Sequence, residues 1–152
     1  MGRSSTPGAM ALGGILFLIL SSWAHAACDT AVGEFVSITG AVDVQASGNT
    51  AWSKAALETQ LCEGDTIRVG ERSRAAVSLI NDAVLRIDQN TALRLIDITP
   101  AEQETSLLDM VRGAFQSFSR KPKFMRVNTP YLNGSIEGTE FALRVSPDES
   151  AL

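Results

Sequence analysis

The sequence predicts an all-β fold in a single domain of short strands, and three observations support this prediction. After the first thirty or so residues, runs rich in Val, Ile, Leu and Thr are broken every few positions by Gly, Asn or Asp. Within these runs apolar and polar residues alternate, as they do on a half-buried strand. The 152 residues suit one ordinary domain, and 45% hydrophobic and 20% charged residues are globular values. We expect one core, built either as a solenoid or as a sandwich-like meander.

The N-terminal segment has the features of a secretory signal peptide. Arg3 supplies positive charge, residues 9–20 are apolar, and the run Ala24-His25-Ala26 carries small residues at the two specificity positions of a cleavage site. The apolar run is short for a membrane span. We predict that residues 1–26 are a signal peptide and that residues 27–152 form the all-β domain.

This prediction places the mature protein in the periplasm without a membrane span. The main alternative is a membrane anchor formed by the uncleaved segment. A lipoprotein is a weaker alternative, because Cys28 follows two alanines but His25 stands where a lipobox has a bulky aliphatic residue.

Charge and histidine content limit the classes of function. The net charge is −4, and cleavage would remove Arg3 and the only histidine but no acidic residue. An acidic chain without a cluster of Lys and Arg offers little to a phosphate backbone, so we expect no nucleic-acid partner. Without histidine, the mature chain lacks the commonest general base and the commonest metal ligand. This argues against an enzyme and against a bound metal or cofactor.

Two cysteines, Cys28 and Cys62, would meet an oxidising compartment after export. We predict that they form a disulfide, which by the chain-entropy argument would contribute about 3 to 4 kcal/mol to stability. Two buried free thiols are the alternative.

The first half of the predicted domain contains the clearest strands. Residues 35–44 alternate around Gly40 and predict two strands or one bent strand, with turns at residues 47–49 and 63–65. Trp52, the one tryptophan after the signal segment, is expected in the core.

Three apolar pairs then recur at a spacing of eight residues, separated by the turn formers Asn81-Asp82 and Gln89-Asn90. The spacing fits stacked rungs or a meander equally well. The pairs are Val77 with Leu79, Leu85 with Ile87, and Leu93 with Leu95.

The second half is harder to assign. Residues 101–118 have both helical and strand features, and we favour strand. Residues 119–123 predict a basic surface loop, residues 125–127 a strand, and the alternation of residues 141–145 a final strand.

Carboxylates are the remaining candidates for chemistry. Glu137 with Glu140, or Asp82 with Asp88, would in principle serve as an acid and base pair of the glycosidase kind. The spacing is not diagnostic, and carboxylates near turns are usually surface residues.

A series of short motifs, in this order and at these distances, resembles the FecR family. It includes Gly-Asp at 64–65, Ser-Arg-Ala at 73–75, Thr-Pro at 129–130 and Gly-Thr-x-Phe at 138–141, within a span of about residues 33 to 145. The residues that carry the resemblance mark the fold rather than a binding site. They are Trp52, Gly64, Asp65, Ser73, Arg74, Asp88, Thr129, Pro130, Gly138, Thr139 and Phe141.

The resemblance implies a β-rich periplasmic domain that senses through protein contacts, with an outer-membrane transporter, a membrane sensor or another periplasmic protein as partner. Only about eight residues precede the apolar segment, so the cytoplasmic anti-sigma region of the best-known members is not expected. The family usually continues with further strands, which predicts that this sequence is a fragment. Iron is implied by the family alone. The alternative function is a saccharide- or peptidoglycan-binding or structural module.

Overall fold

The computed structural model describes residues 28–100, 106–131, 133–146 and 150–151, and this part of the chain contains strands and no helix. The predicted signal peptide lies outside it. The all-β prediction is therefore confirmed. The strands are β1 (Gly33–Thr39), β2 (Val42–Gln45), β3 (Trp52–Lys54), β4 (Gln60–Leu61), β5 (Thr66–Val69), β6 (Arg74–Leu79), β7 (Val84–Ile87), β8 (Thr91–Asp97), β9 (Ser106–Asn128), β10 (Asn133–Val145) and β11 (Ser150–Ala151).

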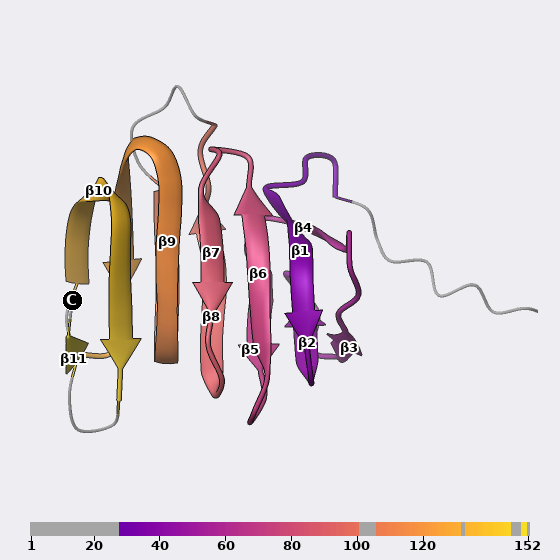
Figure 1. Ribbon diagram of the computed structural model, residues 1–152. Helices are drawn as coiled ribbons and strands as arrows, with labels where there is room; N and C mark the ends of the chain where they lie inside the picture. The colour runs from indigo at the N-terminus through magenta and orange to yellow at the C-terminus, as the bar shows by residue number, and fades with distance from the viewer. Residues whose placement is uncertain (1–27, 101–105, 132, 147–149, 152) are drawn as a thin grey trace, which may run out of the picture.

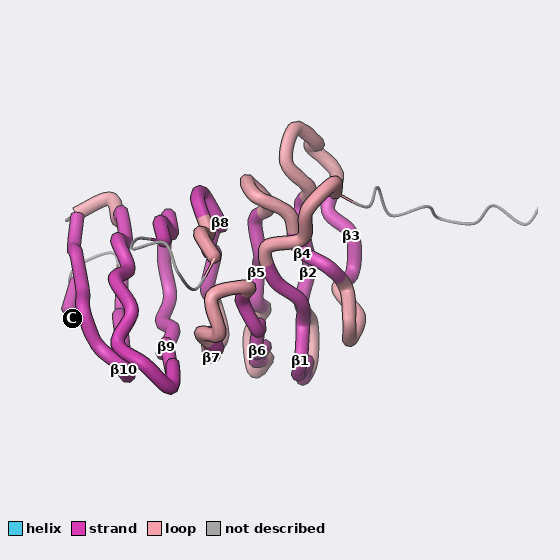
Figure 2. The backbone as a smooth tube through the Cα atoms, turned by 90° about the horizontal axis from the view of Figure 1, so that it is seen from above, coloured by secondary structure: helices cyan, strands magenta, loops and turns pink. Residues whose placement is uncertain are grey.

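All strands belong to one antiparallel sheet curled into a half-barrel (Figure 1). The strand order is β3-β2-β5-β8-β9-β7-β6-β1-β4, and β10 pairs with β9 outside this path. Strands β1, β6 and β7 lie in front of β2, β5 and β8, and Figure 2 shows the same two rows from above. We call these rows the front half and the back half.

The chain passes between the halves at four corners, at Gly40, residues 70–73, residues 88–90 and Gly113. Gly40 and Gly113 have φ values of 80° and 105°, which an L-residue with a side chain rarely adopts. Hydrogen bonds join each corner to the next. The N–H of Gly70 donates to the carbonyl of Ala41, that of Asn90 to Gly70, and that of Asp88 to Ala114.

These corners explain the order of the sheet. β1 continues into β2, β5 into β6, and β7 into β8, while the single strand β9 bends at Gly113. Each unit crosses both halves, and neighbouring units run antiparallel. The molecule is thus a meander of bent strands. It differs from a solenoid of parallel rungs, although its corners are aligned as solenoid corners are.

A single hydrophobic core lies inside the bend, and the three apolar pairs of the sequence repeat all point into it. Their six side chains are at most 4% exposed. Val77 on β6 pairs directly with Leu85 on β7, whereas Leu93 lies on β8 in the back half. The period of eight therefore reflects the length of one short strand plus one turn, and it does not mark identical rungs.

The predicted disulfide is confirmed, because the sulfur atoms of Cys28 and Cys62 are bonded. The bond joins the segment before β1 to the residue after β4. Beside it, the N–H of Val32 donates to the carbonyl of Leu61 at 2.8 Å. The N-terminal end of the described chain is thereby fixed to the β1 and β4 end of the sheet.

Two sequence predictions were wrong in this half-barrel. Trp52 is not a core residue: it lies on the outer strand β3 and is 38% exposed. Residues 119–123 are on the surface as predicted but belong to β9 rather than to a loop.

The second error has a geometric cause. Between the pairs Phe118 with Glu140 and Lys123 with Gly138, the register of β9 and β10 shifts, so four residues of β9 lie opposite one of β10. Both strands curve over the top of the molecule in Figure 1. Such an irregular bend has the charged, proline-containing composition of a loop. Strand was the correct assignment for residues 106–118, and residues 101–105 lie outside the described part.

Among the described residues, no helix is long and apolar enough to cross a membrane.

Candidate functional site

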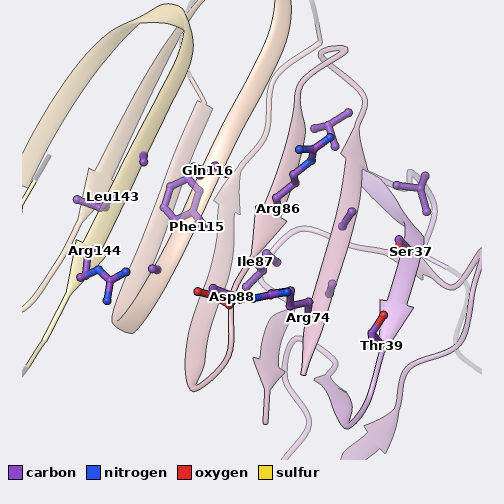
Figure 3. A pocket seen from close by; sticks show the side chains of 16 residues that line it. Ser37, Thr39, Arg74, Arg86, Ile87, Asp88, Phe115, Gln116, Leu143 and Arg144 are labelled. Carbon is purple, nitrogen blue, oxygen red and sulfur yellow. Dashed lines mark hydrogen bonds and ion pairs between the residues drawn. The ribbon is translucent and has the colours of Figure 1, made fainter. Parts of the chain in front are cut away.

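The outer face of the front half carries an open groove with a volume of about 900 Å³ (Figure 3). It crosses β1, β6, β7, β9 and β10, so five strands contribute its floor. We call it the arginine groove, because Arg74, Arg86 and Arg144 line it. A smaller hollow of about 310 Å³ adjoins it, since Thr39, Arg74 and Asp88 line both.

The strand register arranges the groove residues in two rows that run across the sheet. Alternation explains why these side chains face outward: Arg86 stands between buried Leu85 and Ile87, as Arg144 stands between Leu143 and Val145. The first row is Thr39, Arg74, Asp88, Ala114 and Arg144. The second row is Ser37, Ala76, Arg86, Gln116 and Ala142.

One carboxylate balances part of this positive charge. The Nε of Arg74 lies 3.3 Å from an Asp88 carboxylate oxygen. A hydrogen bond from the Gln89 backbone N–H, followed by the hydrogen bond and charge of Arg74 and the charge of Arg144, holds the pKa of Asp88 below its ordinary value of 3.8. Asp88 is therefore ionised at neutral pH and counters mainly Arg74.

Arg86 and Arg144 have no ion-pair or hydrogen-bond partner for their guanidinium groups within the described residues. Arg86 stacks over Phe118 with its Cζ 4.7 Å from the ring centroid, which leaves the N–H donors around its rim unused. Beside them lie apolar groups, of which Val36 is 47% exposed. The groove thus offers unpaired cationic donors next to a small apolar surface.

The groove reaches β10, which is the outermost long strand on this side of the described sheet. No strand of the described chain pairs with the outer side of residues 133–143, because β11 pairs only with Arg144 and Val145. Such an edge presents a row of backbone N–H and C=O groups that a further strand can use. Since Ala142 and Arg144 lie on β10 itself, a strand added there would continue the groove floor.

Three of the residues predicted from sequence meet at this surface. Arg74 and Asp88 form the ion pair in the groove, and Phe141 packs edge-on against Phe115 beneath it, with ring centroids 5.8 Å apart. Thr139 and Gly138 lie farther along β10, at the register shift. An added Cβ at Gly138 would meet nothing closer than 3.7 Å, so neither positive φ nor close packing requires glycine there.

Other residues of the predicted set hold turns. The buried Asp65 carboxylate accepts the N–H groups of Ser47 and Cys62, both at 2.8 Å, across the turn that contains Gly64. Ser73 accepts the N–H of Ala41 at the corner between the halves. Both side chains accept hydrogen bonds from backbone N–H groups of turns and corners, which is a structural task.

The pair Thr129 and Pro130 follows the end of β9, before β10 begins. The N–H of Tyr131 donates to the Thr129 hydroxyl at 3.3 Å, so this pair belongs to the hairpin turn.

Trp52 belongs to the opposite face of the molecule. The guanidinium carbon of Arg68 lies 4.1 Å from the Trp52 ring centroid, and Arg68 also pairs with Asp43 at 2.8 Å. One face of the indole is thus covered by a cation. An exposed tryptophan is what a saccharide platform would use, but here its ring already has an internal partner.

The two carboxylate pairs do not form acid and base sites in the described structure. Asp82 and Asp88 lie beyond opposite ends of β7, whose four residues separate them by more than about 10 Å along the strand direction. Glu137 and Glu140 lie on either side of the register shift on the exposed strand β10. Within the described ranges, no group of three or more His, Cys, Asp or Glu side chains is placed to hold a metal ion.

Sequence reasoning did not single out Arg86, Gln116 or Arg144 as surface residues of interest. Apolar neighbours on both sides give the outward direction of Arg86 and Arg144, and Gln116 lies between Phe115 and Ser117, which are both buried. This pattern does not show that β6, β7, β9 and β10 lie side by side, because this neighbourhood depends on the long bent strand β9.

The comparison with protein-family models decides the family. The model described as FecR protein matches residues 65–152, which is more than half of the chain. The chain belongs to the FecR family. FecR domains are generally non-catalytic regulatory domains, and the disulfide of this member is consistent with an oxidising compartment. Searches of curated proteins and of solved structures found no match.

The matched range has a bearing on the site. It includes all three arginines of the groove, Asp88 and the whole of β10. Cys28, Trp52 and the strands β1 to β4 precede it, although the motif resemblance began at about residue 33.

Proposed function

We propose that this FecR domain is an exported, non-catalytic protein-binding module that senses or scaffolds in envelope signalling. Its partner is an envelope protein, such as an outer-membrane transporter, a membrane sensor or another periplasmic protein. Residues 27–152 act as one domain in this proposal, after loss of residues 1–26. Family membership supports a regulatory role, and the geometry supports binding through the sheet.

The observation that carries the proposal is the outer edge of β10. Over residues 133–143 this edge has no neighbouring strand in the described structure, and it adjoins the arginine groove. Extended segments of partner proteins bind such edges by adding a strand, with backbone hydrogen bonds giving affinity and side-chain contacts giving specificity. We therefore assign the partner contact to β10.

Site-specific photocrosslinking in intact cells tests this assignment. A photoreactive amino acid replaces Ser135 or Glu137, which are exposed on β10, or Leu57, which is 61% exposed before β4 at the other end of the sheet. Captured proteins and the mature N-terminus are identified by mass spectrometry in iron-replete and iron-starved cultures. We expect an envelope protein captured from β10 and not from Leu57.

The outcomes separate the candidate functions. Equal capture from β10 and Leu57, or capture only of a second copy of this chain, would contradict the proposal. The 38% exposure of Trp52 is the one observation that favours a saccharide-binding role. The purified domain would then be retained on peptidoglycan. If Trp52→Ala abolishes this retention and substitutions on β10 do not, the saccharide-binding alternative is established.

A further inference from the structure

We propose that the arginine groove binds an acidic extended segment of the partner protein, with Arg86 and Arg144 as the residues that select its carboxylates. This inference rests on the proposed function and specifies the chemistry of the partner. It concerns side-chain recognition in the groove, whereas the proposed function concerns the backbone edge of β10.

The first argument is the contrast between local and overall charge. The chain carries a net charge of −4, yet three arginines and one aspartate line the groove. A local excess of positive charge on an acidic protein attracts anionic groups over distances of about a Debye length, roughly 8 to 10 Å. The overall composition of the protein, which is acidic, does not account for this local positive charge.

The second argument is that two guanidinium groups lack partners. Asp88 pairs with Arg74, while Arg86 and Arg144 make no ion pair or hydrogen bond within the described residues. A guanidinium offers five N–H donors in a planar fork that matches a carboxylate. Figure 3 shows Arg86, Arg74 and Arg144 projecting from the same face of the sheet.

The third argument is the spacing set by the register. Arg86 is opposite Gln116, which is opposite Ala142, two residues before Arg144. With strands about 4.8 Å apart and about 3.3 Å of rise per residue, the Cα atoms of Arg86 and Arg144 lie roughly 12 Å apart. An extended peptide rises about 3.3 Å per residue, so two acidic residues four positions apart would place one carboxylate beside each arginine.

The floor between these arginines also suits a polypeptide. The alanines at 76, 114 and 142 allow close approach, Gln116 offers an amide, and Val36 and Val84 give apolar contacts at one side. A segment in which acidic and apolar residues alternate would direct all its acidic side chains to one face, toward the arginines.

Binding of a defined probe tests the inference. The probe is a fluorescein-labelled peptide of alternating Glu and Val, with a Gln and Val peptide of equal length as its uncharged match. Fluorescence anisotropy is measured with the full exported protein at low and at physiological salt. We expect binding of the Glu peptide only, weakening as salt screens the charges.

The variants Arg86→Gln and Arg144→Gln should each weaken binding about tenfold, the effect of losing one charge-assisted hydrogen bond. Lys54→Gln is the matched control, because it removes one positive charge from β3 on the opposite face. It should change the affinity by less than about twofold, since its charge is more than a Debye length away. Asp88→Asn should strengthen binding, because it releases Arg74.

Two results of the binding experiment would overturn the inference. One is that the Glu peptide binds equally to the parent protein and to both groove variants. The other is that it fails to bind while an anionic polysaccharide binds in an Arg86- and Arg144-dependent way, which would assign the groove to a glycan. Circular dichroism and thermal melts verify that each variant is folded. If photocrosslinking from β10 still captures a protein partner in both groove variants, the inference fails and the proposed function stands.

Discussion

The front and back faces of the half-barrel use arginine in different ways. On the back face Arg68 pairs with Asp43 and covers Trp52, and Arg94 donates to the carbonyl of Gly64. On the front face Arg86 and Arg144 have no polar partner in the described structure. Arginine side chains therefore stabilise the fold on the back face, whereas those of Arg86 and Arg144 on the front face are available to bind another molecule. This difference in pairing, more than the number of charges, is the reason for placing the proposed contact on the front face.

The largest expected effect on stability comes from a substitution at Gly113, where β9 passes between the two halves. Gly113 has a φ of 105°, and an added Cβ would collide with the backbone of Thr91. Gly113→Ala should lower the free energy of unfolding by about 3 kcal/mol or more, from backbone strain and overpacking together. Denaturant unfolding followed by circular dichroism measures the change.

Gly48→Ala is the control for this experiment. Gly48 also has a positive φ, of 74°, but its added Cβ would meet no atom within 4 Å. Only the conformational strain remains, so we expect a loss of about 1 kcal/mol. Equal losses for the two variants would show that the corner at Gly113 is not tightly packed.

The second effect concerns Trp52 on the back face. Core tryptophans typically cost about 3 to 5 kcal/mol when replaced by alanine. Because Trp52 is 38% exposed and packs mainly against Arg68, Trp52→Ala should cost only about 1 kcal/mol. A loss in the core range, measured by the same unfolding experiment, would restore the sequence-based expectation.

The third prediction sharpens the comparison itself. Arg68→Gln should lower the free energy of unfolding by about 0.5 to 1 kcal/mol, because it loses a partly exposed ion pair and a ring contact. Arg144→Gln should leave stability within about 0.5 kcal/mol of the parent, as expected for a surface residue without an ion pair. If Arg144→Gln is the more destabilising, the two faces do not differ in the way described.

The smallest effect is a pH dependence at Asp88. Its pKa is lower in the folded protein than the ordinary value of 3.8, so its ionised form stabilises the fold. This contribution is complete above the unfolded-state pKa and disappears as the pH falls through the folded-state pKa. The stability difference between the parent and Asp88→Asn should therefore shrink below about pH 4. A difference that is constant from pH 2 to pH 7 would contradict this assignment.

Local patterns were sufficient to predict much of this molecule. Alternation identified the strands around the pairs Val77 with Leu79 and Leu85 with Ile87, and the number of cysteines together with the expected export predicted the disulfide. The family resemblance was confirmed over residues 65–152. These features depend on residues close in sequence or on composition, which a sequence displays directly.

What escaped prediction depends on contacts between distant residues. Trp52 was assigned to the core from its residue type, but the edge position of β3 leaves it exposed. The bend of β9 and β10 has the composition of a loop and the pairing of a strand. The groove was missed because Arg74 and Arg144, 70 positions apart, become neighbours only when β9 turns at Gly113.

The position of the disulfide affects how a pulling force would act on the sheet. It fixes residue 28 to the β1 and β4 end of the sheet, while the open edge of β10 is at the other end in Figure 1. Hydrogen bonds in an antiparallel sheet run perpendicular to the strands. A force applied between these two ends of the sheet would thus act along these bonds, strand by strand. Under such a pull the sheet is loaded in its peeling direction rather than in shear.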